Sequence, residues 1–177
     1  TLAAKEKNIM MRAENLKITF NPGTPIENPA LRGMSLSIAD GEFVTVIGSN
    51  GAGKSTFLNA ISGDLAVDSG IICIDNQDVA RLPAHKRAPL VARVFQDPMA
   101  GTCEALSIEE NMALAYKRGQ KRSLGLALNK STREFFREKL SLLKLGLENR
   151  LTDRMGLLSG GQRQAVSLLM ASLQPSK

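Results

Sequence analysis

The chain opens with alternating apolar and polar positions. Within residues 12–20 apolar side chains recur at every second position near the end of the segment, which is the period of a half-buried strand. A turn-rich stretch with two prolines follows, and the period of two returns between Leu31 and Ile38. The pattern predicts antiparallel strands in this part of the chain. Residues 1–11, which are mostly polar with scattered charges, are expected to form a flexible lead-in.

Two later segments have nearly continuous apolar runs instead of alternation. Residues 42–47 (EFVTVI) and 90–95 (LVARVF) are short and rich in β-branched residues, which is typical of strands buried on both faces. Asp40-Gly41, directly before the first run, is a hairpin signal. Residues 71–74 (IICI) predict a further strand.

Helical periodicity dominates from about residue 103 to residue 151. Capping boxes at 107–110 (SIEE) and 131–134 (STRE) predict the starts of two helices, and 119–130 is expected to be a loop between them. The second helix has an amphipathic face made by Phe135, Phe136, Leu140, Leu143 and Leu147. This block has the pattern of a helical insertion in an α/β domain.

Residues 48–56 read GSNGAGKST and match G-x-x-x-x-G-K-[ST], a phosphate-binding loop. Its glycines allow consecutive N–H groups to converge on an anion, Lys54 supplies positive charge, and the Ser55 hydroxyl is placed to bind Mg²⁺. A glycine-rich turn that fits by chance is the alternative, expected in well under about 1% of chains of this length. The predicted nucleotide-binding residues are Ser49, Asn50, Gly51, Ala52, Gly53, Lys54, Ser55 and Thr56.

A second glycine motif, LSGGQ at 158–162, precedes an apolar helix whose predicted face contains Ala165, Leu168, Leu169 and Leu173. Ser159 and Gln162 stand at capping-box spacing, and two glycines fill the first turn, where helix propensity disfavours them. A helix N-terminus without side chains can bind an anion. Alone, the motif is equally compatible with a flexible helix start, but the phosphate loop earlier in the chain favours the anion site.

Composition restricts the remaining function classes. The net charge of +6 is compatible with nucleic acid or an anionic membrane surface. However, six Phe, one Tyr and no Trp supply few rings for base stacking, so we expect no nucleic-acid partner. The densest basic patch, expected to be solvated, contains Lys117, Arg118, Lys121 and Arg122. No apolar run approaches the roughly 18 residues that cross a bilayer.

Histidine and cysteine chemistry are poorly represented. His85 is the only histidine, so no histidine-based catalytic or metal constellation is available, and we expect it in an exposed loop. Cys73 and Cys103 stand in unrelated contexts, which favours buried thiols in a reducing compartment over a disulfide or a metal site.

With GSNGAGKST, FQDP at 95–98 and LSGGQ in this order, the chain resembles the nucleotide-binding domain of an ABC transporter ATPase over residues 12–177. The resemblance implies an α/β fold, with a P-loop NTPase core, an antiparallel β subdomain and an inserted α-helical subdomain. It places the β subdomain and P-loop core at 12–96, the helical subdomain at 97–158 and the signature helix at 159–177.

The resemblance also implies roles for single residues. Phe20 is similar to the aromatic residue that stacks on adenine, although a strand Phe packed in a core fits the position equally well. Gln96 resembles the glutamine that contacts Mg²⁺ and the attacking water, and with Lys54 it forms the expected catalytic set. In a head-to-tail dimer that encloses two ATP molecules, the γ-phosphate held by the other subunit would contact the signature residues Ser159, Gly160, Gly161 and Gln162.

The residues around the motifs resemble those of the ATPase component of bacterial uptake systems for small solutes, amino-acid-like ones among them. It implies ATP and Mg²⁺, separate transmembrane permease subunits, an extracytoplasmic solute-binding protein and a cytoplasmic position on the inner face of the cell membrane. Two alternatives stay open. One is a soluble ABC ATPase that acts on ribosomes or DNA, and the other is a nucleotide-binding module without hydrolysis.

The sequence departs from the family after the signature helix. In the family, this helix leads to an apolar strand ending in Asp-Glu and then to a switch histidine, none of which precedes Lys177. We therefore expect the C-terminal part of the core to be absent from these 177 residues. We also expect them to bind ATP but hydrolyse it poorly, because they carry no general base.

Overall fold

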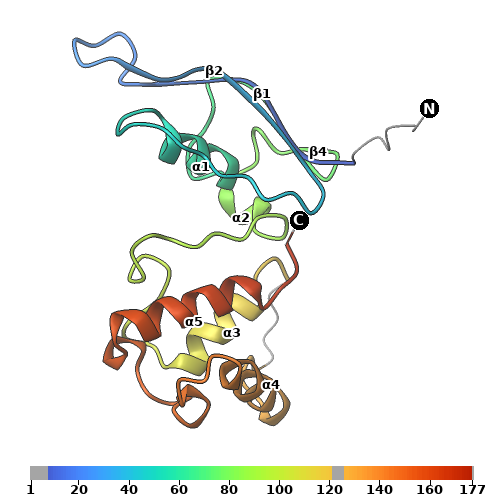
Figure 1. Cartoon of the computed structure of the whole chain (residues 1–177), viewed down its shortest axis with the longest axis vertical. Coiled ribbons are helices and arrows are strands. Elements are labelled where there is room, and N and C mark those ends of the chain that lie inside the picture. Colours follow the sequence, from blue (N-terminus) through green and yellow to red (C-terminus); the bar gives the residue numbers. More distant parts are fainter. Residues whose placement is uncertain (1–7, 121–125, 177) are drawn as a thin grey trace. The chain divides into compact units, whose positions relative to one another are not determined.

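The computed structural model describes residues 8–120 and 126–176, and Figure 1 traces the whole chain. The chain divides into two compact units, the first reaching to Val91 and the second running from Ala92 to Ser176. Each unit has its own buried cluster of apolar side chains, so each is described by itself.

The first unit is built on one antiparallel sheet with the strand order β2-β1-β3-β4. Its strands are β1 (Ile9–Phe20), β2 (Asn28–Ala39), β3 (Ser69–Ile74) and β4 (Gln77–Asp78). The sheet confirms the antiparallel strands predicted from the alternation, with Ile18 opposite Leu31 and Ala13 opposite Ile72. The predicted lead-in of 1–11 is too long, because β1 already begins at Ile9; residues 1–7 lie outside the described residues.

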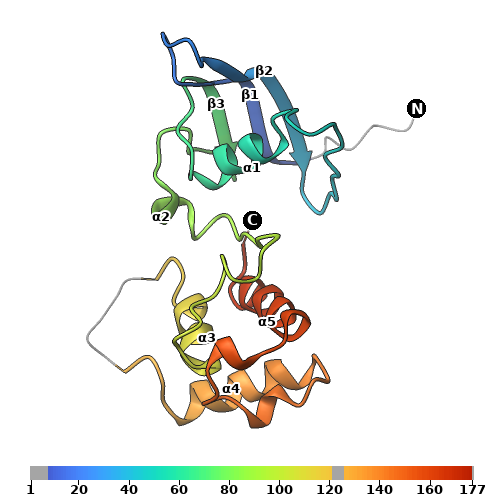
Figure 2. The same ribbon diagram turned by 90° about the vertical axis from the view of Figure 1, so that its left-hand side faces the viewer.

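Helix α1 (Lys54–Ser62) covers one face of this sheet (Figure 2). Phe57 and Ala60 are buried in the same cluster as Leu16 and Ile72, so the helix is fixed by its apolar face. It ends at Gly63, which adopts the left-handed conformation at the C-cap. A short helix, α2 (Ala84–Arg87), follows β4.

The predicted strands at 42–47 and 90–95 are wrong for this structure. Both segments are irregular, and Phe43 and Ile47 are 92% and 89% exposed. A strand buried on both faces needs neighbouring strands and a covering layer on each side. Within the described residues no strand pairs with either segment. Asp40-Gly41 accordingly forms a turn that leads to no second strand.

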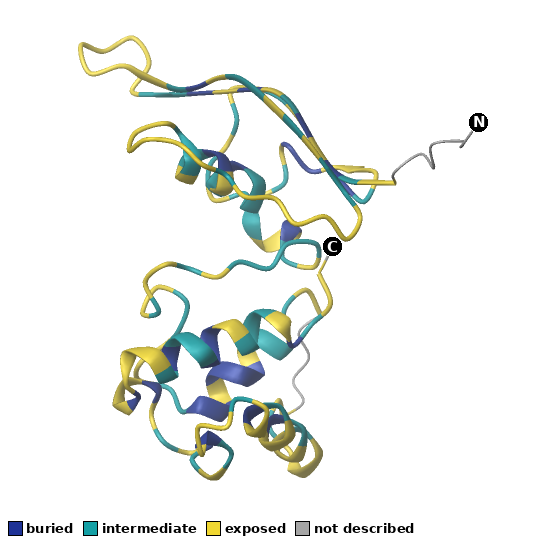
Figure 3. Cartoon of the chain, in the orientation of Figure 1, coloured by how far each residue is buried: buried dark blue, intermediate teal, exposed yellow. Residues whose placement is uncertain are grey.

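The second unit is helical. It consists of α3 (Ile108–Tyr116), α4 (Lys130–Ser141) and α5 (Gly160–Ser172), with 3₁₀ turns at η1 (Leu147–Asn149) and η2 (Met155–Leu157). One residue from each long helix, Met112, Phe136 and Val166, is fully buried in a shared cluster. Figure 3 marks the buried positions along the ribbon of this unit in dark blue. The unit is therefore held together by packed apolar side chains, and it includes α5, which the sequence assigned to a separate segment at 159–177.

One of the three capping boxes predicted in this unit is misplaced. The box at Ser107 is present, with Glu110 as its reciprocal partner. The box predicted at 131–134 is wrong, because α4 begins two residues earlier with Asn129 as N-cap and Thr132 as partner. Asparagine and serine are similarly good N-caps, and here Asn129 Oδ1 accepts from the Thr132 N–H while Thr132 Oγ1 accepts from the Asn129 N–H. The predicted loop before it includes residues 121–125, which lie outside the described residues.

The buried face of α5 also differs from the predicted one. Leu173 is buried as expected, but Leu168 is 52% exposed. The buried stripe instead runs through Arg163 and Val166, at helical spacing from Leu173. Because this stripe begins with an arginine, the pattern of apolar residues in the sequence does not reveal it.

Candidate functional site

The phosphate loop has the backbone that its glycines predict, with one exception. Gly51 and Gly53 have φ angles of 81° and 82°, a region that other residues rarely adopt. At Gly53 a Cβ atom would lie 2.7 Å from the carbonyl oxygen of Ala30, so only glycine fits there. Gly48 is the exception, because its φ is not positive and a Cβ there would approach the Ala52 side chain at 3.3 Å.

Lys54 is folded over the loop that precedes it. Its Nζ atom donates hydrogen bonds to the carbonyl oxygens of Gly48 at 2.6 Å and Ser49 at 2.7 Å. The ammonium group is thereby held at the loop's own backbone, next to the glycines. This places positive charge where the motif requires it for phosphate binding.

Helix α1 begins directly at the end of the same loop. The N-cap is Gly53, which offers no side chain, and no side-chain hydrogen bond caps the helix there. The Phe57 N–H bonds to the Gly53 carbonyl at 2.8 Å, so the N–H groups of the preceding turn are the ones available to an acceptor. Ser55 lies in that turn and is exposed. Available donors and the positive end of the helix dipole favour an anion here.

The LSGGQ motif forms the N-terminus of α5 in the second unit. The predicted capping box is present: Ser159 Oγ accepts from the Gln162 N–H at 3.3 Å, and Gln162 Oε1 accepts from the Ser159 N–H at 3.1 Å. Gly160 and Gly161 are exposed, and a Cβ on either would meet no atom within 4 Å. The packing of this chain therefore does not require glycine at these two positions.

A residue that sequence reasoning missed supports the signature helix. The Arg163 side chain is buried, and its guanidinium pairs with the Glu104 carboxylate and donates to the Gly156 carbonyl at 3.2 Å. An arginine directly after the motif reads as a surface residue, so the sequence offered no signal. The contact ties the first turns of α5 to two preceding segments of the same unit.

Gln96 and Phe20 lie outside these two motifs. Gln96 is exposed in an irregular segment of the second unit. Phe20 ends β1 and is half-buried against the apolar cluster of the first unit. The structure thus documents the core contact of Phe20, and the roles of both residues toward a nucleotide stay predictions.

The remaining candidates from the sequence are not part of these motifs. His85 is exposed as expected, although in α2 and not in a loop. The thiols are free but not buried as predicted, since Cys73 is half-buried and Cys103 exposed. In the basic patch, Arg118 is not simply solvated, because it donates to backbone carbonyls of the α5 end; Lys121 and Arg122 lie outside the described residues.

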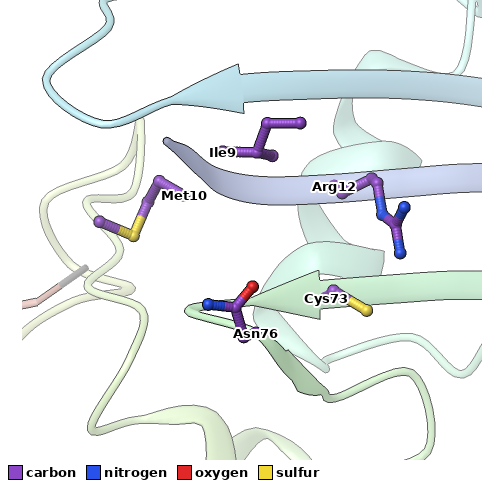
Figure 4. A pocket seen from close by; sticks show the side chains of 5 residues that line it. All are labelled: Ile9, Met10, Arg12, Cys73 and Asn76. Atoms are coloured by element: carbon purple, nitrogen blue, oxygen red, sulfur yellow. The ribbon is translucent and has the colours of Figure 1, made fainter. Parts of the chain in front are cut away.

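The first unit also has an open pocket, lined by Ile9, Met10, Arg12, Cys73 and Asn76 (Figure 4). It lies where β1 begins. The phosphate loop packs at the opposite end of β1, because Gly53 adjoins Ala30, in the part of β2 that pairs with the end of β1. The pocket contains none of the predicted site residues.

Among residues 8–120 and 126–176, no helix is both long and apolar enough to cross a bilayer.

Comparison with known proteins points to one family. The family model described as ABC transporter matches residues 31–177. The tyrosine transport ATP-binding protein of Clostridioides difficile (strain R20291) is 42% identical over 170 residues, which cover 95% of this chain. The thiamine import ATP-binding protein ThiQ of Salmonella choleraesuis (strain SC-B67) is 37% identical over 134 residues, 76% of this chain. The matches span 66% and 52% of the lengths of these relatives.

Solved structures agree with this result. A dimeric ATP-binding cassette in a post-hydrolysis state, bound to ADP and Pi, is 28% identical, with a TM-score of 0.77 over 94% of this chain and 71% of that one. A dimeric bacterial ABC transporter cassette gives 27% identity and a TM-score of 0.78 over the same shares. The α/β P-loop cassette fold expected from the motifs is therefore confirmed.

Proposed function

Because the chain belongs to the ABC transporter family, we propose that it acts in the ATP-binding and ATP-hydrolysing subunit of a transporter that imports a small solute. The observation that carries the proposal is the phosphate loop, with two left-handed glycines and a lysine held over its backbone. The alternative of a glycine-rich turn without function does not account for the open helix N-terminus beside it.

Within the first unit, the triphosphate would be held by the loop backbone from Ser49 to Gly53 and by the first turn of α1. The residues fit this ligand because a helix start without a side-chain cap leaves N–H donors for phosphate oxygens. Lys54 would exchange its two carbonyl contacts for phosphate oxygens. Thr56 adds a further polar group in the same turn, and Phe20 is the proposed contact for the adenine ring.

Mg²⁺ would be held by the Ser55 hydroxyl and by Gln96. Both side chains carry oxygen donors, the ligand type that Mg²⁺ prefers, and both residues are exposed. The ion supplies charge neutralisation between phosphate oxygens when bound. Gln96 would also orient the attacking water, which makes it the proposed catalytic partner of Lys54.

The signature helix is proposed to act across a dimer. Two glycines that intramolecular packing does not require leave the start of α5 open to a ligand. The reciprocal hydrogen bonds of Ser159 and Gln162 stabilise the backbone conformation of the first turn of α5. A head-to-tail pair of chains would then place this helix start at the γ-phosphate of the partner's nucleotide. The two dimeric cassettes among the similar structures support this arrangement.

The names of the relatives support a proposal for the partners and the solute. Proteins named for tyrosine transport, thiamine import and spermidine/putrescine import are all similar to this chain, and the first has the highest identity of the three. We therefore place the chain on the cytoplasmic face of a membrane, with separate permease subunits and an extracytoplasmic solute-binding protein. An amino-acid-like solute is the proposed cargo.

Binding of MgATP to the purified chain tests the central claim. We expect saturable binding that Lys54→Ala abolishes and that Lys17→Ala, at an exposed lysine of β1, leaves unchanged. If the protein purifies from its source together with permease subunits, this supports a role in transport. The solute is tested by comparing the uptake of tyrosine by that complex with the uptake of thiamine and of spermidine. Equal binding by the wild-type chain and Lys54→Ala would overturn the nucleotide site, and purification with ribosomes or DNA would overturn transport.

A further inference from the structure

Arg87, the last residue of α2, is buried although it carries a charge, with only 1% of its surface exposed. Its Nη1 atom donates to the carbonyl oxygens of Ala60 at 2.6 Å and Ile61 at 2.9 Å, at the C-terminal end of α1. Its Nε and Nη2 atoms donate to the carbonyls of Leu82 at 2.8 Å and Ala80 at 3.0 Å. One guanidinium group thus joins the end of α1 to the segment after β4.

The surroundings of Arg87 are shaped for this side chain. A Cβ at Gly63, the C-cap of α1, would lie 2.9 Å from Arg87 Nε, so glycine there leaves room for the guanidinium. Burial lowers the pKa of Arg87 below its ordinary value, and the negative charges of Asp78 and Asp64 act in the opposite direction. A positive charge at a helix C-terminus also interacts favourably with the helix dipole.

The other end of α1 is the phosphate site. A nine-residue helix is about 13.5 Å long and rigid, so fixing its last turn fixes the direction of its first. We propose that Arg87 is a positioning residue for nucleotide binding, which acts through α1 on the loop residues Gly53, Lys54 and Ser55. This inference rests on the proposed function, because it assigns Arg87 to the same nucleotide site.

Arg118 offers a matched comparison in the second unit. Its guanidinium also donates to carbonyls at the end of a helix, those of Ala171 at 3.4 Å and Gln174 at 3.1 Å near the end of α5. Removal of Arg118 therefore removes the same kind of contact from a helix that does not carry the phosphate loop. Lys86, exposed and next to Arg87, controls for loss of charge in α2.

The experiment measures the Kd for MgATP of the variants Arg87→Met, Arg87→Lys, Arg118→Met and Lys86→Met, at a temperature where circular dichroism shows each to be folded. We expect Arg87→Met to raise the Kd about tenfold or more, because small displacements of positioning groups are costly. Arg87→Lys keeps the charge but not the fork of donors, and should restore only part of the affinity. Lys86→Met should bind as wild type does, and so should Arg118→Met at protein concentrations where the chain is monomeric, because the start of α5 then contacts no partner's nucleotide.

A second measurement applies if a variant is poorly folded or if the chain binds no nucleotide, because it does not depend on the Kd. Amide hydrogen exchange at Phe57, whose N–H bonds to the Gly53 carbonyl in the first turn of α1, should be faster without nucleotide in Arg87→Lys than in wild type and unchanged in Lys86→Met. Wild-type affinity together with wild-type exchange in Arg87→Lys would overturn the inference. Absence of binding by the wild-type chain, with the exchange effect intact, would count against the proposed function and leave the positioning of α1 by Arg87 supported.

Discussion

The buried guanidinium of Arg163 forms an ion pair with the carboxylate of Glu104, 59 positions earlier in the chain. Arg163 lies in the first turns of α5, and Glu104 lies in the segment between Gln96 and α3. The pair therefore connects the proposed signature helix with the segment that follows the proposed catalytic glutamine, inside one unit.

Glu104→Ala removes the carboxylate and leaves the Arg163 charge buried with one backbone acceptor. We expect a loss of about 1–3 kcal/mol in the free energy of unfolding, since a buried charge without its partner is costly. Urea denaturation measures it. Glu138→Ala breaks an exposed pair with Lys139 and should change stability by less than about 1 kcal/mol. Equal losses in the two variants would contradict the assigned role of Glu104.

Gly161→Ala tests the open start of α5. A Cβ there meets nothing within 4 Å, so helix propensity should raise the free energy of unfolding by roughly 0.5–1 kcal/mol. The added methyl group should at the same time weaken ATP-dependent dimerisation, measured by light scattering, if this turn contacts the partner's nucleotide. Gly146→Ala also has open space, but its φ of 70° should make the same change destabilising. Unchanged dimerisation of Gly161→Ala would contradict the proposed contact.

The features that the sequence predicted correctly are local ones. The capping boxes at Ser107 and Ser159 depend only on residues within one turn. The predicted strand at 42–47 is wrong because burial on both faces is not a local property. Its apolar pattern describes a burial that requires neighbouring strands, and no residue inside the segment supplies them.

In the candidate site, too, some features follow from the local sequence and others do not. The glycine backbone of the phosphate loop follows from the motif, because the motif restricts each residue directly. Arg87 and Arg163 do not follow, because a charged residue in a polar sequence context is expected at the surface. Each also has a partner far away in the chain, the Ala60 carbonyl 27 positions before Arg87 and the Glu104 carboxylate 59 positions before Arg163, and only the folded structure identifies these.

The corrected start of α4 can be tested directly. Asn129→Ala removes the side chain that accepts from the Thr132 N–H at 2.9 Å, and should cost about 1 kcal/mol of unfolding free energy. Ser131→Ala, at the position where sequence spacing placed the cap, should stay within about 0.5 kcal/mol of wild type. Thermal unfolding followed by circular dichroism measures both. A larger loss for Ser131→Ala than for Asn129→Ala would restore the original assignment.

The capping box at the start of α3 makes stability depend on pH. The pKa of Glu110 is lowered below its ordinary value of 4.5, first by the Ser107 backbone N–H and then by the Ser107 hydroxyl, which donate to Glu110 Oε2 at 2.7 Å and 2.8 Å. A lowered pKa in the folded state means that this contact stabilises the protein above the unfolded pKa. The stabilisation is lost as the pH falls from about 4.5 through the lower folded pKa.

Urea denaturation between pH 7 and pH 3 measures this effect. Glu110→Gln should lose stability at pH 7 and show a shallower decline toward pH 3 than wild type, because its side chain does not titrate. Ser107→Ala removes the hydroxyl donor, so the decline should also become shallower, but less than in Glu110→Gln because the backbone donor remains. If the Glu110→Gln profile runs parallel to that of the wild type over this range, the capping box at the start of α3 does not contribute to acid sensitivity.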